Sequence, residues 1–99
     1  MSEQAMLLTI AEYFKTQPVL KAWLFGSFSR GEETPESDVD ILVRYDENAK
    51  ISLLTISHMM GVLEKLIHRR VDLVEEGTLL PFAVESANRD KKLVYERAN

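Results

Sequence analysis

The segment from Gly26 to Val43 constrains the fold of this chain more than any other part of it. A Gly-Ser pair at positions 26–27 follows an apolar run, and Ser-Asp-Val-Asp-Ile-Leu-Val occupies positions 37–43. Side chains two residues apart on a strand project from one face, so we expect Asp38 and Asp40 to point the same way. Backbone amides at the start of a helix bind phosphate, and carboxylates bind divalent cations. The segment therefore predicts a phosphate-binding turn beside a cation site, an arrangement suited to nucleoside triphosphate chemistry.

Length, charge and the absence of cysteine limit the classes of protein to consider. The chain has 99 residues, a formal net charge of −4 and no cysteine. This is the length of one small domain, without room for a second ligand-binding domain. The lack of thiols excludes disulfides and thiolate metal sites, so a metal would bind oxygen ligands, His58 or His68. The negative charge gives no basis for direct nucleic-acid binding.

The hydropathy pattern gives no sign of membrane association. No apolar run approaches the ~20 residues of a membrane-spanning helix. The first four residues, Met-Ser-Glu-Gln, lack the basic-then-apolar order of a secretory signal. We therefore expect a cytoplasmic location.

Apolar side chains recur at helical spacing in some segments and form short runs in others, and polar or proline-containing turns separate them. The expected helices cover residues 3–15 (capped by Ser2), 28–33, 52–67 and a last segment from Thr78 or Pro81 through Ala87. The expected strands cover residues 19–25, 39–45 and 71–74. Residues 33–37 and 88–90 are expected to form turns, and residues 93–95 a short apolar finish.

This alternation predicts the α/β or α+β class, with a small mixed sheet of three to four strands and helices packed on it. The connection between the first two strands is too short for the usual parallel crossover, which also favours a mixed sheet. In the helix over 52–67, the residues expected on the buried face are Leu53, Ile56, Met60, Leu63 and Ile67. Arg69 and Arg70 follow it and are expected to form a cationic patch at the helix end.

A third carboxylate completes the predicted cation site. Asp72 lies inside the apolar strand at 71–74, where an acid is costly without a partner or a metal. Mg²⁺ prefers carboxylate oxygens, and two such ions neutralise the phosphate and align the reacting groups. We therefore expect Asp38, Asp40 and Asp72 to bind two Mg²⁺ ions, with Glu75 and Glu76 as weaker candidates. The alternatives are a solvated strand edge or turn cap for the first two, and a paired strand-end acid for Asp72.

Gly26, Ser27 and Arg30 are the candidates for phosphate binding. Gly26 lets the backbone approach closely, Ser27 offers its hydroxyl and amide, and Arg30 can reach a phosphate oxygen. Ser27 also fits a helix N-cap, and Arg30 also fits a surface ion pair. Trp23 is expected in the core rather than stacked on a base, and His58 at the surface.

Taken together, Gly26-Ser27-x-x-Arg30-Gly31-Glu32 and Ser37-Asp38-x-Asp40-Ile41-Leu42-Val43 resemble the signature of the DNA polymerase beta nucleotidyltransferase superfamily. The short chain is similar to its minimal nucleotidyltransferases, including the antitoxin partners of HEPN-domain toxins. The resemblance implies a polymerase-beta-like nucleotidyltransferase fold, with residues 1–99 as a single minimal nucleotidyltransferase domain. It places triphosphate at Gly26 and Ser27, metal at Asp38 and Asp40, and the third acid at Asp72 on strand context alone. Ser29 departs from the family, where alanine is common.

The resemblance also implies an activity and a partner. The expected reaction moves a nucleoside monophosphate, AMP from ATP, to a hydroxyl acceptor on a HEPN-type toxin, and the chain thereby acts as an antitoxin. Two alternatives stay open. The chain could neutralise a HEPN ribonuclease by docking without catalysis, or act as a homo-oligomer on a small hydroxylated molecule. The acceptor, the base preference and the oligomeric state are not fixed by the sequence.

Overall fold

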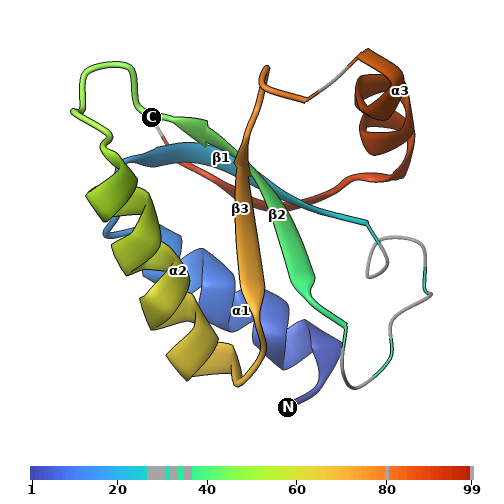
Figure 1. Cartoon of the computed structure of the whole chain (residues 1–99). Coiled ribbons are helices and arrows are strands. Elements are labelled where there is room, and N and C mark those ends of the chain that lie inside the picture. The colour runs from blue at the N-terminus through green and yellow to red at the C-terminus, as the bar shows by residue number, and fades with distance from the viewer. Residues whose placement is uncertain (27–30, 32–33, 35–36, 80, 99) are drawn as a thin grey trace.

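The chain folds into four strands and three helices, described by a computed structural model for residues 1–26, 31, 34, 37–79 and 81–98 (Figure 1). The elements in chain order are α1 (Glu3–Phe14), β1 (Val19–Phe25), β2 (Val39–Tyr45), α2 (Leu53–Ile67), β3 (Val71–Glu75), α3 (Pro81–Asp90) and β4 (Lys92–Glu96). No helix in these described ranges is both long and apolar enough to cross a membrane.

Most of the expected elements are confirmed, because their signals are local. β1 and β2 have the predicted bounds. The hydroxyl of Ser2 caps α1 by accepting a hydrogen bond from the Ala5 amide at 3.1 Å. α2 follows Ser52, which exchanges capping-box hydrogen bonds with Thr55. In the expected turn before β2, the Ser37 amide donates to the Thr34 carbonyl at 3.0 Å.

One expectation near the C-terminus is wrong, and the structure adds detail to another. Residues 88–90 continue α3 instead of forming a turn, because the backbone bonds of the helix persist as far as Lys91, whose amide donates to the Ala87 carbonyl at 2.9 Å. The apolar finish at 93–95 belongs to a fourth strand, β4, that pairs with β1. The short helix predicted over 28–33 lies outside the described residues, except for Gly31.

The four strands form one mixed sheet in the order β3-β2-β1-β4. β2 and β3 are parallel, and β1 pairs antiparallel with both β2 and β4. The parallel pair is possible because α2 carries the chain back between β2 and β3, as a crossover requires. The predicted mixed sheet is therefore confirmed.

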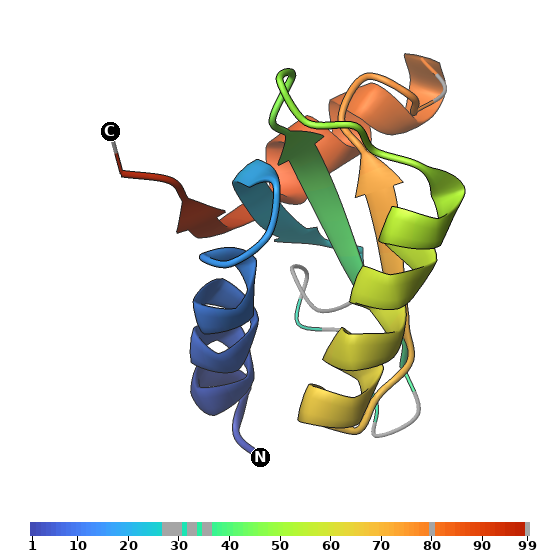
Figure 2. The same cartoon turned by 90° about the vertical axis from the view of Figure 1, so that its left-hand side faces the viewer.

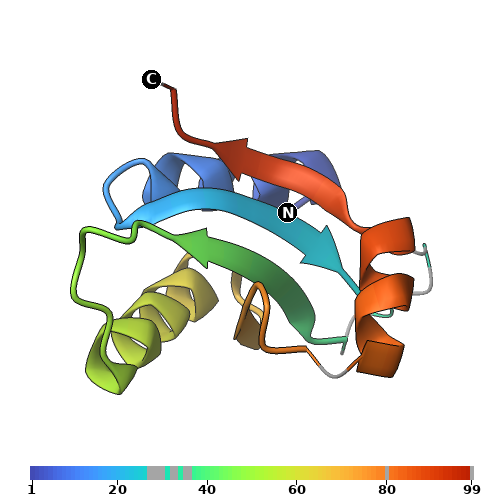
Figure 3. The same ribbon diagram turned by 90° about the horizontal axis from the view of Figure 1, so that it is seen from above.

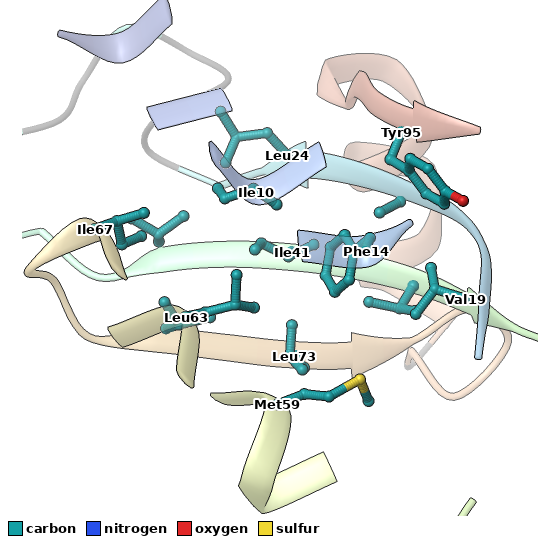
Figure 4. Packing of buried hydrophobic residues seen from close by; sticks show 14 of the residues in the cluster. Ile10, Phe14, Val19, Leu24, Ile41, Met59, Leu63, Ile67, Leu73 and Tyr95 are labelled. Carbon is teal, nitrogen blue, oxygen red and sulfur yellow. The ribbon is translucent and has the colours of Figure 1, made fainter. Parts of the chain in front are cut away.

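α1 and α2 lie side by side on one face of the sheet, and α3 lies across one end of the opposite face (Figures 2 and 3). The core between the sheet and the first two helices includes Ile10, Phe14, Ile41 and Leu63, all fully buried (Figure 4). This layer covers one face of the sheet, and α3 covers only one end of the other.

The buried stripe of α2 agrees with the predicted one at Leu63 and Ile67 and differs from it at Leu53. Its buried residues are Met59, Leu63 and Ile67, whereas Leu53 is 83% exposed and Ile56 and Met60 are half-buried. The helical period was predicted correctly, but the face that turns inward depends on how α2 packs against α1 and the sheet.

The opposite face has its own small apolar layer. Trp23 and Leu42 are register partners on β1 and β2, and both are buried although they lie outside the main core. Lys91, directly after α3, places its Nζ 4.4 Å from the centroid of the Trp23 ring. The expectation that Trp23 packs inside the protein is confirmed, and α3 is held close to this face.

Candidate active site

Two of the predicted acids are direct neighbours across the parallel strands. Asp40 on β2 and Asp72 on β3 are register partners, and adjacent strands lie about 4.8 Å apart. The residues flanking them, such as Ile41 and Leu73, are buried against the helices, so both acids project from the opposite face. Asp72 is exposed and Asp40 is half-buried. Asp38 is exposed and directly precedes β2, two residues before Asp40.

The register that pairs Asp40 with Asp72 is set at the starts of the two strands. The Val39 amide donates to the Arg70 carbonyl at 2.8 Å. The carboxylate of Glu64, near the end of α2, accepts a hydrogen bond from the Val71 amide at 3.0 Å. Sequence reasoning missed Glu64, because its position on a helix does not reveal which strand amide it faces.

Gly26 lies directly against the carboxylate of Asp40. Its φ is +76°, and a Cβ built on it would lie 2.5 Å from Oδ2 of Asp40. Any other residue at this position would therefore both strain the backbone and displace the carboxylate. The predicted close approach of the backbone at Gly26 is thus directed at Asp40. Ser27 and Arg30, the other predicted phosphate-binding residues, lie outside the described residues.

Arg69 holds the backbone immediately before the Asp38-x-Asp40 pair. Its Nη1 donates to the Thr34 carbonyl at 3.0 Å and to the Ser37 carbonyl at 3.2 Å. The sequence suggested a cationic patch at the end of α2, or contact with phosphate or a partner, and the cationic patch still describes the exposed Arg70. Thr34 lies 35 positions before Arg69 and Ser37 lies 32 positions before it, so no local signal in the sequence could have revealed these contacts.

The donor set of this end of the sheet suits a hard divalent cation. Asp40 and Asp72 offer carboxylates on adjacent strands, and Mg²⁺ prefers such oxygens while keeping several waters. Within the described ranges, no three or more acid or histidine side chains are already gathered around a common point. Binding of metal by Asp38, Asp40 and Asp72 therefore stays a prediction. The structure supports it most directly at Asp40 and Asp72, which are register partners.

Glu75 and Glu76, the weaker candidates for metal ligands, are less favourably placed than Asp40 and Asp72. Glu76 is held by Arg44, whose Nε donates to Oε1 at 2.8 Å and whose Nη2 donates to Oε2 at 3.1 Å. Glu75 is exposed and lies at an odd number of positions from Asp72, so it projects from the other face of β3.

A cavity of about 290 Å³ lies on the same face of the sheet as Asp40 and Asp72. It lies between α3 and the end of β1, and its described lining residues are Phe25, Gly26, Leu79, Phe82, Ala83, Ala87 and Asp90. Gly26 borders both this cavity and the Asp40 carboxylate. One end of the sheet thus combines carboxylates, a glycine turn and an apolar hollow.

Comparison with known protein families gives a match over most of the chain. Residues 7–94 match the family described as "Nucleotidyltransferase domain". "Putative protein adenylyltransferase MJ1379" of Methanocaldococcus jannaschii is 40% identical over 73 residues, which cover 73% of this chain and 71% of that protein. "Protein adenylyltransferase MntA" of Thermococcus cleftensis is 46% identical over 56 residues, which cover 57% of this chain and 54% of that protein.

Solved structures share the fold. One described as "Structure of putative minimal nucleotidyltransferase" has a TM-score of 0.75 and 30% identity, covering 90% of this chain and 89% of that one. A toxin–antitoxin crystal structure with AMP-PNP has a TM-score of 0.73 and 18% identity, covering 97% and 75%. A tri-AMPylated HEPN toxin of Shewanella oneidensis in complex with MNT antitoxin has a TM-score of 0.71 and 17% identity, covering 97% and 74%. The last two, at low identity, show the shared fold alone.

Proposed function

The chain belongs to the nucleotidyltransferase domain family, and on this premise we propose that it transfers AMP from ATP to a hydroxyl group on a HEPN-type toxin, with Mg²⁺ as cofactor. The resemblance to minimal nucleotidyltransferases is confirmed by this match, and its named relatives are protein adenylyltransferases. The chain is therefore a nucleotidyltransferase, and the nucleotide, the metal and the acceptor are the proposed part.

The observation that carries the proposal is the pairing of Asp40 with Asp72 on the open face of the sheet, beside Gly26. Carboxylates on adjacent strands and on one face of a sheet can share a divalent cation, which prefers such oxygens. Bound Mg²⁺ would neutralise charge on the phosphate oxygens and orient the two reacting groups. Asp38, exposed and two residues before Asp40, would supply the third ligand.

The protein groups have distinct roles in the proposed transfer. The turn at Gly26 and Ser27 holds the β- and γ-phosphates, and Arg30 supports them. The acceptor hydroxyl oxygen forms a bond to the α-phosphorus while the bond to the β-phosphate oxygen breaks, and pyrophosphate leaves with the electron pair. The hydroxyl proton passes to the Asp72 carboxylate, which faces solvent and can release it.

The choice of a protein acceptor rests on the relatives and on the size of the site. The named relatives are protein adenylyltransferases, and one structure of the same fold contains an AMPylated HEPN toxin. The cavity beside the acids holds about 290 Å³, near the lower limit of ~300 Å³ for a small-molecule pocket. A surface of the partner is therefore the better candidate to complete the acceptor side.

Labelling with ATP tests the proposal. The chain is incubated with α-labelled ATP, Mg²⁺ and the candidate HEPN toxin, and transfer of label to the toxin is measured. We expect label on the toxin, and none with the Asp38→Asn, Asp40→Asn double variant. The double variant Glu47→Gln, Glu85→Gln loses the same charge at exposed positions and should label normally. Labelling that survives loss of both aspartates would disprove the mechanism.

The same preparation separates catalysis from docking. Toxin activity is assayed after mixing with the chain in the presence and absence of ATP. Under the proposed function, neutralisation requires ATP and is lost in the Asp38→Asn, Asp40→Asn variant. Neutralisation without ATP by that variant would instead support an antitoxin that acts by docking.

A further inference from the structure

The cavity under α3 has the wrong chemistry for phosphate and the right chemistry for a flat ring. Its described lining contains five apolar side chains, one glycine and one carboxylate, and no cationic side chain. Phosphates need cations or backbone amides, whereas a nucleobase is bound by apolar and aromatic surfaces with a few polar groups. At about 290 Å³, the cavity suits one ring system rather than a whole nucleotide.

Phe82 gives this cavity an aromatic wall. It is 78% exposed on α3 although it is a large apolar side chain, and nothing in its own helix requires it there. An aromatic side chain at the edge of a cavity can stack on the face of a base, which contributes roughly 1–3 kcal/mol per base. Phe25, half-buried at the end of β1, lines the same cavity.

Asp90 gives the cavity one hydrogen-bond acceptor. Its side chain is only 22% exposed, and within the described part of the chain its recorded ion pair is a long one, 3.7 Å from Nε of Arg89. It is also the last residue of α3, where a negative charge opposes the helix dipole. The position of Asp90 is therefore unfavourable for the helix itself, which points to a role toward a ligand that donates hydrogen bonds.

We propose that the cavity between α3 and β1 binds the adenine base of the nucleotide, with Phe82 stacked on the ring and the Asp90 carboxylate accepting a hydrogen bond from the exocyclic amine. This inference rests on the proposed function. Gly26 joins the two parts of the site, because it borders this cavity and the carboxylate that would face the phosphates.

The same chemistry discriminates between purines. Adenine presents an amino group at position 6, which suits the acceptor Asp90. Hypoxanthine and guanine present a carbonyl oxygen there, to which the described lining side chains offer no donor, while their N1–H remains able to donate to Asp90. A buried acceptor left without a partner, facing a carboxylate, weakens binding. Comparison of ATP with ITP and GTP therefore tests whether Asp90 faces position 6 of the ring.

Nucleotide binding in the absence of acceptor protein tests the assignment. Affinities of the full chain for ATP, ITP and tripolyphosphate, each with Mg²⁺, are measured by calorimetry. We expect ATP to bind at least about tenfold more tightly than ITP or tripolyphosphate. Asp90→Asn, whose amide can donate to a carbonyl, should lower the preference for ATP over ITP by about tenfold. Phe82→Ala should weaken ATP binding by about tenfold and leave tripolyphosphate unchanged.

Two neighbours on α3 that do not line the cavity serve as matched controls. Glu85→Gln removes a charge and Val84→Ala shortens an apolar side chain, and both should bind like the unchanged protein. Two results would overturn the base site while leaving labelling of the toxin intact. One is equal affinity for ATP, ITP and tripolyphosphate. The other is binding by Asp90→Asn and Phe82→Ala that matches binding by these controls. Tighter binding of GTP than of ATP would also overturn it. Failure of every triphosphate to bind would remove the proposed function as well.

Discussion

Gly26 and Asp40 are packed so closely that the space between them excludes a methyl group. A Cβ at position 26 would lie 2.5 Å from Oδ2 of Asp40, and the backbone there has a φ of +76°. The relationship joins the glycine of the Gly-Ser pair to the Asp38-x-Asp40 pair of the signature. The glycine therefore serves the position of Asp40 as much as the conformation of the turn.

Replacing Gly26 tests this relationship. We expect Gly26→Ala to lower the free energy of unfolding by about 1–3 kcal/mol through strain and displacement, and to reduce adenylyl transfer at least about tenfold. Chemical denaturation and the labelling assay measure the two effects.

Two other glycines are the controls for this substitution. Gly77 has a φ of +95°, and a Cβ built there meets no described atom within 4 Å apart from its chain neighbours. Gly77→Ala should therefore lose stability without losing transfer. Gly61→Ala lies in the interior of α2 with open space around it and should gain about 0.5–1 kcal/mol. Transfer by Gly26→Ala equal to that by Gly77→Ala would show that the contact with Asp40 is unimportant.

Asp72→Asn should separate stability from function. Removing one of two like charges at register positions is expected to raise the free energy of unfolding by about 0.2–1 kcal/mol without metal. Added Mg²⁺ should stabilise the unchanged protein by mass action and should stabilise the variant much less. Thermal unfolding with and without Mg²⁺ measures both terms, and Glu85→Gln is the exposed control. An equal Mg²⁺ response in all three proteins would argue against Asp72 as a ligand.

Arg69 is expected to position the acid pair. Its two hydrogen bonds to the carbonyls of Thr34 and Ser37 depend on the guanidinium geometry, which lysine lacks. Arg69→Lys should raise several-fold the Mg²⁺ concentration needed for half-maximal transfer. The free energy of unfolding should change by about 1 kcal/mol or less. The matched variant Arg70→Lys changes an exposed side chain and keeps the backbone carbonyl that accepts the hydrogen bond from the Val39 amide. A normal Mg²⁺ dependence in Arg69→Lys would contradict this role.

Tyr45 makes stability depend on pH at the alkaline end. Burial, and to a lesser extent the charge of Glu75, raises the pKa of Tyr45 from 10.0 to about 12. Between these values the folded state keeps a proton that the unfolded state has lost. The contribution is therefore fully present below pH 10 and is lost as the pH rises toward about 12.

Tyr45→Phe removes this dependence. Its hydroxyl is buried without a hydrogen-bond partner in the described part of the chain, so the variant should also be more stable at neutral pH by about 1 kcal/mol. Denaturation across the alkaline range measures both effects. A decline with pH as steep in the variant as in the unchanged protein would assign the effect to other groups.

Local patterns predicted much of the fold because the responsible interactions are local. The bounds of β1 and β2 and the caps at Ser2 and Ser52 follow from signals within a few residues, and the mixed sheet was predicted from the short connection between the first two strands. The extension of α3 over residues 88–90 was missed because Asn-Arg-Asp is polar and resembles a turn, while the backbone bonds of the helix continue through it. The exposure of Leu53 was missed for a different reason, since its spacing matches that of the buried Leu63 and Ile67 and only packing distinguishes them.

By itself, the sequence determined the chemical groups of the site and the spacing of those that are close in the chain. Strand geometry predicts that Asp38 and Asp40 share a face, and Asp38 directly precedes the first residue of β2. The tertiary structure alone decided the relationships between distant segments. It made Asp72 the register partner of Asp40, placed Arg69 on the carbonyl before Asp38, and laid α3 beside Gly26. These depend on which surfaces pack together, and that free energy is a property of the whole core rather than of any one segment.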